Sequence, residues 1–165
     1  MLKVYKGCRD GMVVTLKINR NGLNNLERNC MVDPDHAMFR CQKAEVVAIE
    51  SVVTKETAEM AISGYDEQFC YRVGEMVEEP EYRANIEIVR GKGIHFFLTE
   101  ETAKFYALCL MNFVGHTGEF KSWHDTGQQW ERGQFKDGEK DGEWEWCDDN
   151  GQWHDNSEWK NGMMC

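Results

Sequence analysis

Residues 93–114 carry the clearest pattern of apolar and polar positions in the chain. An apolar run bounded by Gly93 and Thr99 (GIHFFLT) predicts a buried strand. Helical spacing of the apolar residues that follow predicts one long helix over 100–114, with Ala103, Tyr106, Ala107, Leu110 and Val114 on its apolar face. Thr99 suits the N-cap position, and Gly115 suits the end of the helix. A strand that leads directly into an amphipathic helix indicates an N-terminal α+β domain.

Alternation of apolar and polar residues predicts further strands at 2–6, 11–19, 43–50, 67–73 and 86–89. Asp10-Gly11 lies between the first two and is typical of a hairpin turn. The polar stretch 19–35 predicts a loop, whereas 54–62 fits either a short helix or a linker. We therefore expect a mostly antiparallel sheet of five or six strands with one long helix over residues 1–117.

Composition changes near residue 117, which places a domain boundary there. The chain of 165 residues has a net charge of −10, and 41% of it is hydrophobic, enough for a core. Residues 118–165 hold 12 Asp and Glu against 5 Lys and Arg, whereas residues 1–117 hold 17 against 14. All 6 tryptophans also lie in the second segment. Two domains, 1–117 and 118–165, are therefore expected.

The second segment repeats with a period of 24 residues. Gly118 aligns with Gly142, and a first turn at 125–127 aligns with a second at 148–151. This predicts an all-β meander of two hairpin units, in which each unit buries its aromatic residues against the next. The Gly-Glu-aromatic openings and Asn-Gly turns resemble the MORN-type repeat family in its bacterial variant form.

The N-terminal segment also carries a resemblance. Tyr5-Lys6-Gly7, the run 46–49, the positions Ser63, Tyr65-Asp66, Phe69 and Tyr71, and finally Gly93 to Phe97 resemble an uncharacterised domain of large DNA viruses and phages with a GIHFF signature. Members of that group tend to carry a cysteine shortly before the signature, and residues 89–92 (VRGK) depart from this. The resemblance implies a viral or mobile-element origin and brings no established activity.

Several classes of function are disfavoured. The negative net charge argues against binding nucleic acid or an anionic membrane, because both require a basic surface. No apolar run approaches 18 residues, and no signal peptide is evident at the start. The 7 cysteines are odd in number and irregularly spaced, which predicts free thiols and a cytoplasmic location in a host cell. Spacings among Cys and His do not match zinc motifs, and no phosphate-binding motif occurs, so we expect neither metal nor cofactor.

Candidate catalytic residues each have a simpler structural interpretation. His95 within the apolar run suits a catalytic base or a ligand, but also a core histidine with one hydrogen bond. The cluster Ser63, Tyr65 and Asp66 suits a polar site or an ordinary turn. Glu100 and Glu101 suit the glutamate of an NAD-linked enzyme of ADP-ribosyltransferase type, which we keep as an alternative; they also suit the first turn of a helix.

The strongest surface feature is the run 139–146 (EKDGEWEW). In a strand, Glu143 and Glu145 would point to one face and Trp144 and Trp146 to the other. The tryptophans alone would make a repeat core, but the excess of acids over lysines suggests a surface for a basic partner. The residues expected to bind it are Glu139, Asp141, Glu143, Glu145, Asp148 and Asp149, supported by the charges of Asp155 and Glu158, with Trp130 and Trp153 as aromatic anchors.

These patterns together predict a non-enzymatic interaction protein of viral or phage type. Its acidic, Trp-rich β surface is expected to bind a basic surface on a host protein. Because carboxylates compete with phosphates for Lys and Arg, the target we expect is a nucleic-acid-binding protein or a host defence complex, inhibited in the manner of an anti-CRISPR protein. The sequence does not indicate an oligomeric state.

Overall fold

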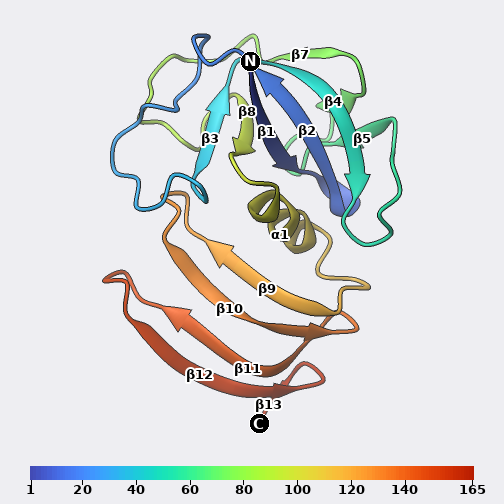
Figure 1. Cartoon of the computed structure of the whole chain (residues 1–165), viewed down its shortest axis with the longest axis vertical. Coiled ribbons are helices and arrows are strands. Elements are labelled where there is room, and N and C mark those ends of the chain that lie inside the picture. Colours follow the sequence, from blue (N-terminus) through green and yellow to red (C-terminus); the bar gives the residue numbers. More distant parts are fainter.

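The structure is a computed structural model that describes residues 1–154 and 157–165. Two antiparallel sheets lie on either side of one helix, with the first sheet above it and the second below it in Figure 1. Mostly antiparallel sheets with a single α-helix confirm the predicted α+β class in this coarse sense.

The first sheet has six strands in the order β3-β8-β1-β2-β4-β7. Their bounds are β1 Leu2–Gly7, β2 Met12–Ile18, β3 Met38–Cys41, β4 Lys43–Ser51, β7 Met76–Glu78 and β8 Ile94–Phe97. A 3-10 turn, η1 (Arg9–Gly11), joins β1 to β2, with positive φ at Asp10 (56°) and Gly11 (66°). This confirms the predicted hairpin. The buried core beside this six-stranded sheet includes Val4, Val14, Leu16 and Phe96, all at 0% exposure.

Parts of the first domain differ from the prediction. Residues 54–62 form no helix, and strand β5 (Met60–Ile62) pairs instead with β6 (Cys70–Arg72) in a separate two-stranded sheet. The predicted strand 67–73 is thus only three residues long. β3 and β7 were not predicted, and β3 shows no alternation because all four of its residues are buried. The expected five or six strands are eight within residues 1–117.

The predicted strand at 86–89 is wrong, because the backbone there is turned inward around a buried cation. Arg40 is 1% exposed and donates hydrogen bonds to the carbonyl oxygens of Arg83, Asn85, Ile88 and Lys92. Its guanidinium also lies 4.4 Å from the ring centroid of Tyr82. These carbonyls are therefore directed at a side chain and are not used in a ladder with another strand.

Helix α1 (Glu100–Leu110) is shorter than predicted. It begins as expected, because the Thr99 side chain accepts a hydrogen bond from the backbone N–H of Thr102. It ends at Leu110 because Asn112 and Phe113 have positive φ, which turns Phe113 to stack on Phe135 at 4.1 Å between centroids. Val114 is therefore 67% exposed, and its helical spacing was coincidental.

The second sheet begins at Gly118, and each strand pairs with the next along the chain. Its strands are β9 Gly118–Trp123, β10 Gln129–Lys136, β11 Glu139–Cys147, β12 Trp153–Lys160 and β13 Met163–Met164. β9 lies nearest the helix (Figure 1). Phe120, Phe135 and Trp144 form its core, against Phe105 and Phe113 from the helix and the turn after it.

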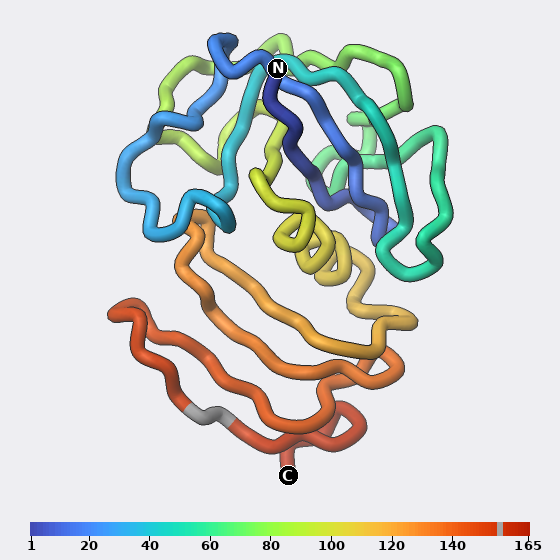
Figure 2. The backbone as a smooth tube through the Cα atoms, in the orientation of Figure 1, coloured from blue at the N-terminus to red at the C-terminus, as the bar shows by residue number. Residues whose placement is uncertain are grey.

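The first turn of this sheet docks onto the N-terminal domain. In Figure 2 the β9–β10 turn lies beside the loop that precedes β3. The backbone N–H of Val32 donates to the Thr126 carbonyl (2.9 Å), and that of Met38 donates to the Asp125 carbonyl (3.1 Å). The Asp125 carboxylate pairs with Arg90, with N–O distances of 2.7 and 2.9 Å. Backbone and side-chain contacts thus join the two sheets away from the helix as well.

Candidate functional site

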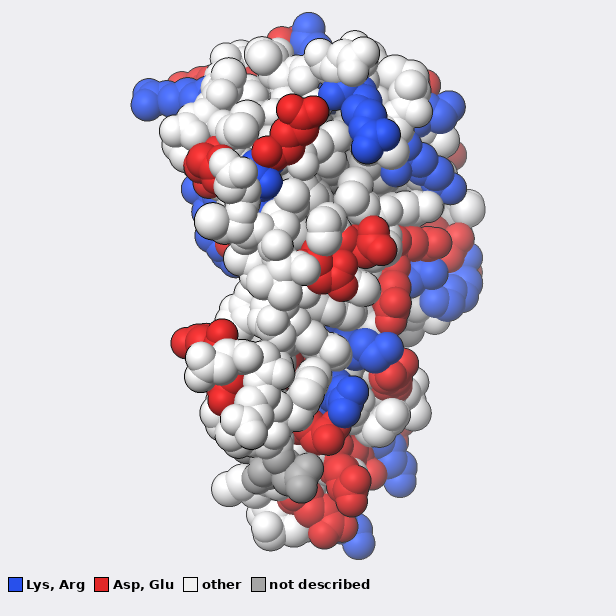
Figure 3. All heavy atoms as spheres, turned by 60° about the vertical axis from the view of Figure 1, so that its left-hand side comes forward, with Lys and Arg blue, Asp and Glu red and all other residues white. Residues whose placement is uncertain are grey.

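Strand β11 separates its acidic and aromatic side chains onto opposite faces. Trp144 is 2% exposed and packs in the core of the sheet. The acidic residues of β11 occupy the odd-numbered positions and therefore lie on the opposite face of the sheet from Trp144. We call this the outer face, and its acidic residues on β11 are Glu139, Asp141, Glu143 and Glu145. The acidic run is thus a row of four carboxylates at every second position of one strand. In Figure 3, acidic and basic side chains are interspersed over the lower part of the molecule.

The outer face also brings two glutamates directly opposite each other. Glu143 on β11 is the register partner of Glu158 on β12, and both are exposed. Among the described residues neither forms an ion pair. Glu145, in contrast, pairs with Arg132 on the adjacent strand β10. Like charges directly opposite on adjacent strands destabilise a sheet. The outer face therefore carries acidic charge that the fold itself does not neutralise.

The acids of the β11–β12 turn divide into two roles. The Asp148 carboxylate accepts hydrogen bonds from the backbone N–H groups of Asn150 (2.9 Å) and Gln152 (3.0 Å), and it contacts His154 Nε2 at 2.8 Å. These contacts, that with His154 first, lower the pKa of Asp148. It therefore builds the turn, whereas the Asp149 side chain is exposed and forms no ion pair with any described residue. Asp155 lies outside the described residues.

The two expected aromatic anchors are both at the surface. Trp130 is 51% exposed and stacks on His124 with 4.6 Å between ring centroids. Trp153 is partly exposed on the outer face, with the Arg132 guanidinium 4.2 Å from its ring centroid. Arg132 thus contacts both Trp153 and Glu145, and a partner that covers this face would meet a flat, stacked pair of side chains.

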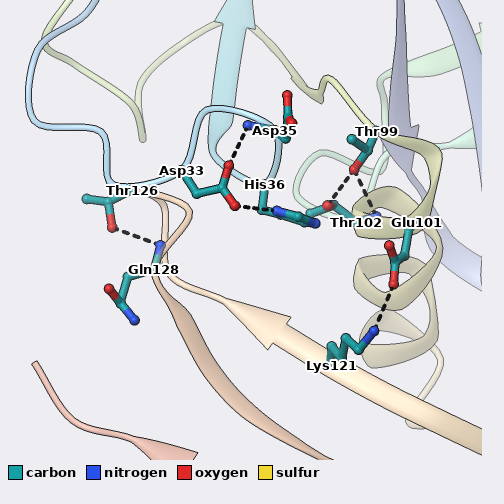
Figure 4. Close-up of polar contacts among 9 residues, drawn as sticks. All are labelled: Asp33, Asp35, His36, Thr99, Glu101, Thr102, Lys121, Thr126 and Gln128. Carbon is teal, nitrogen blue, oxygen red and sulfur yellow. Dashed lines mark hydrogen bonds and ion pairs between the residues drawn. The ribbon is translucent and has the colours of Figure 1, made fainter. Parts of the chain in front are cut away.

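A polar hollow of about 450 Å³ lies between the outer face and the N-terminal domain. Its lining includes His36, which contacts Asp33 (Nδ1 to Oδ2, 2.8 Å) and stacks on Trp123 with 4.5 Å between centroids. Figure 4 shows that the His36 ring points from its loop toward helix α1, near the Glu101–Lys121 pair. Sequence reasoning did not identify His36 or Trp123, because nothing in the sequence relates positions 87 residues apart.

The candidate catalytic residues are not brought together. Glu100 pairs with Lys104 (2.9 Å), and Glu101 pairs with Lys121 (3.3 Å), at the first turn of α1. His95 lines a different cavity, and its Nε2 lies 2.9 Å from the Val89 carbonyl oxygen. Burial is the main cause that lowers the pKa of His95 to about 4. The single hydrogen bond matches the expectation of a core histidine.

The structure also bears on the sequence predictions about turns, cysteines, metal ligands and membrane-spanning helices. Ser63 and Asp66 accept hydrogen bonds from the backbone N–H groups of Tyr65 and Gln68, two residues ahead of each, so they shape turns as expected. All seven cysteines are free thiols. Among the described residues, no group of three or more His, Cys, Asp or Glu side chains is arranged to hold a metal ion. No helix within the described chain has both the length and the apolar character needed to cross a membrane.

Fold and surface define an α+β protein with two large antiparallel sheets and a third of two strands, and the sheet that begins at Gly118 has an acidic outer face. The chain belongs to a family of unknown function, DUF5758, whose model matches residues 1–103. Comparison with curated proteins and with solved structures gave no match. The matched region ends inside helix α1, so the second sheet lies beyond it.

Proposed function

We propose that this is a non-enzymatic interaction protein, and that the outer face of β11 and β12 binds a basic surface of a partner protein. The observation that carries the proposal is the Glu143–Glu158 register pair, which places two exposed carboxylates opposite each other, neither of them in an ion pair with any described residue. A single Lys or Arg from a partner, placed between them, would contact both carboxylates and halve their combined charge. Such a contact converts a local repulsion in the free protein into attraction in the complex.

The residues around this pair fit the anatomy of a binding surface. Asp141 and Glu139 continue the acidic row, and Asp149 adds charge at one end. Trp153 under Arg132 supplies the flat aromatic and cationic area that interfaces favour. The acidic charge of the outer face requires a partner of positive charge, and the Trp153 ring contributes area that becomes buried in the complex.

We further propose that the partner is a host nucleic-acid-binding protein or defence complex, which the protein would inhibit. Two considerations support this idea. Carboxylates compete for the same Lys and Arg that bind phosphates, and the GIHFF run of the N-terminal segment is the basis of the expected viral or phage origin. We also propose that the second sheet is a two-unit repeat of the MORN type. In its support, the matched turn glycines Gly127 and Gly151 have similar φ values of 84° and 80°.

The test is a charge reversal on the outer face with a matched control. The test variant combines Asp141→Lys, Glu143→Lys and Glu158→Lys. The control combines Glu27→Lys, Glu56→Lys and Glu59→Lys, which change net charge equally at exposed positions of the N-terminal domain. Tagged proteins are used to capture partners from a host-cell lysate at low and high salt.

We expect a basic protein that is retained at low salt by the unmodified chain and by the control but not by the test variant. Circular dichroism confirms that all three are folded. Equal capture of the same partner by the test variant would overturn the proposal, as would a partner whose binding does not weaken with salt.

A further inference from the structure

Lys6 on β1 is a lysine buried without a carboxylate partner. It is 4% exposed, and among the described residues no Asp or Glu oxygen lies within 4.0 Å of its amine. Its Nζ donates one hydrogen bond, to the His95 carbonyl oxygen at 3.2 Å, and lies 5.6 Å from the ring centroid of Tyr71. Buried lysines are normally paired with an acid, so this one lacks the usual neutralising group.

The residues that surround the amine also line an open cavity of about 260 Å³. Lys6, Tyr71 and His95 contribute to its wall from three different strands. Tyr65 and Phe69 add further aromatic surface, and Ser63 adds a hydroxyl. The amine therefore belongs to a pocket whose walls combine aromatic rings with polar side chains, of a size suited to a small molecule.

The surroundings of the amine favour its uncharged form. Burial lowers the pKa of Lys6, an effect that the nearby thiols of Cys8 and Cys41 only partly oppose. The His95 imidazole is neutral at pH 7, since its pKa is lowered to about 4. An uncharged amine is a nucleophile, and desolvated lysines are the ones that form Schiff bases.

We propose that Lys6 is a reactive amine, and that this pocket binds a small aldehyde or ketone with which Lys6 forms an imine. The amine nitrogen attacks the carbonyl carbon and gives a carbinolamine. The carbon–oxygen bond then breaks, the carbon–nitrogen double bond forms, and the oxygen leaves as water with the two hydrogens of the amine. No oxidant or reductant is needed. This activity is independent of the outer face.

The other charges of the pocket distinguish a neutral carbonyl compound from an anion. Asp66 and the buried Glu79 line the same cavity, and Lys92 at its edge is already paired with Glu81 at 3.2 Å. Two carboxylates would repel an anionic ligand but not a neutral one. An aromatic aldehyde also matches the walls formed by Tyr65, Phe69 and Tyr71.

The test treats the full chain at pH 7 with benzaldehyde and sodium cyanoborohydride, which reduces imines to stable amines, and maps the modified lysines by mass spectrometry. The exposed Lys3 and Lys17 serve as internal controls in the same sample. We expect Lys6 to be modified faster than either, by about tenfold for each unit by which its pKa is lowered. A Lys6 that stays unmodified while Lys3 and Lys17 react would overturn the proposal.

A second arm uses dextran dialdehyde, a polymer too large to enter a cavity of about 260 Å³. We expect it to modify Lys3 and Lys17 and to spare Lys6 in the folded protein, but to modify all three in urea. Equal modification of Lys6 by both aldehydes without urea would also overturn the proposal, because the reaction would then take place in an opened chain and not in the pocket.

Discussion

A Cβ atom on Gly127 would lie 1.9 Å from the backbone carbonyl oxygen of Asp33, and Gly127 has a φ of 84°. The turn that joins β9 to β10 therefore approaches the N-terminal domain more closely than any side chain would permit. At this point backbone hydrogen bonds join the β9–β10 turn to the segment 32–38 of the N-terminal domain.

Replacing Gly127→Ala should therefore destabilise the protein strongly. The new methyl group meets rigid backbone, and the positive φ adds strain, so we expect a loss of about 2–5 kcal/mol in the free energy of unfolding. The matched control is Gly142→Ala, where φ is 82° but no heavy atom lies within 4 Å. Only the backbone strain, about 1 kcal/mol, applies there. Urea denaturation measures both, and equal losses would show that the close approach is unimportant.

Arg40→Lys should release the segment 80–93. A lysine has one nitrogen and no planar fork, so it cannot donate to all four carbonyls that Arg40 binds. We expect a loss of about 3–5 kcal/mol, as for other buried charges that lose their partners. Trypsin cleavage after Arg83 and Arg90 reports the release. The exposed Arg20→Lys change is the control, and a variant as resistant as the unmodified chain would contradict this account.

His95 should make stability depend on pH in a defined window. Its pKa is about 4 when folded and about 6.5 in a model peptide, so between these values the unfolded chain binds the extra proton. Its contribution is therefore complete above pH 6.5 and is lost as pH falls toward 4. From pH 7 to pH 5 this amounts to about 2 kcal/mol.

The variant His95→Gln isolates that contribution. A glutamine side chain retains an N–H for the Val89 carbonyl but does not titrate. The difference in urea stability between pH 7 and pH 5 should accordingly be smaller for the variant by about the stated amount. If both proteins lose the same stability over this range, His95 does not titrate as inferred.

Sequence patterns predicted those elements whose signals are local. The β1–β2 hairpin follows from Asp10-Gly11, and the β8–α1 junction follows from an apolar run with Thr99 as a cap. The pattern at 86–89 was misleading because its apolar residues belong to a loop whose carbonyl oxygens bind Arg40. Arg40 is 43 to 52 residues away in sequence from the carbonyls of Arg83 and Lys92. Short buried strands such as β3 carry no alternation to detect.

The candidate site was predictable to a similar extent. Alternation along one strand places the acids of β11 on a common face without knowledge of the fold. The opposition of Glu143 and Glu158 depends on strand register, which includes a shift between Trp144 and Glu145. The cavity beside Lys6 gathers residues from distant strands, and only tertiary structure reveals it.

Helix α1 is packed on two sides by different sheets. Ala103 and Ala107 are fully buried with Val13 and Phe97 of the first sheet, whereas Phe105 meets Phe120 of the second, with 5.6 Å between ring centroids. Unfolding of either sheet would strip the helix of one packed side and expose it to water. The whole chain should therefore melt in a single cooperative transition, with equal calorimetric and van't Hoff enthalpies, despite its three separate hydrophobic clusters.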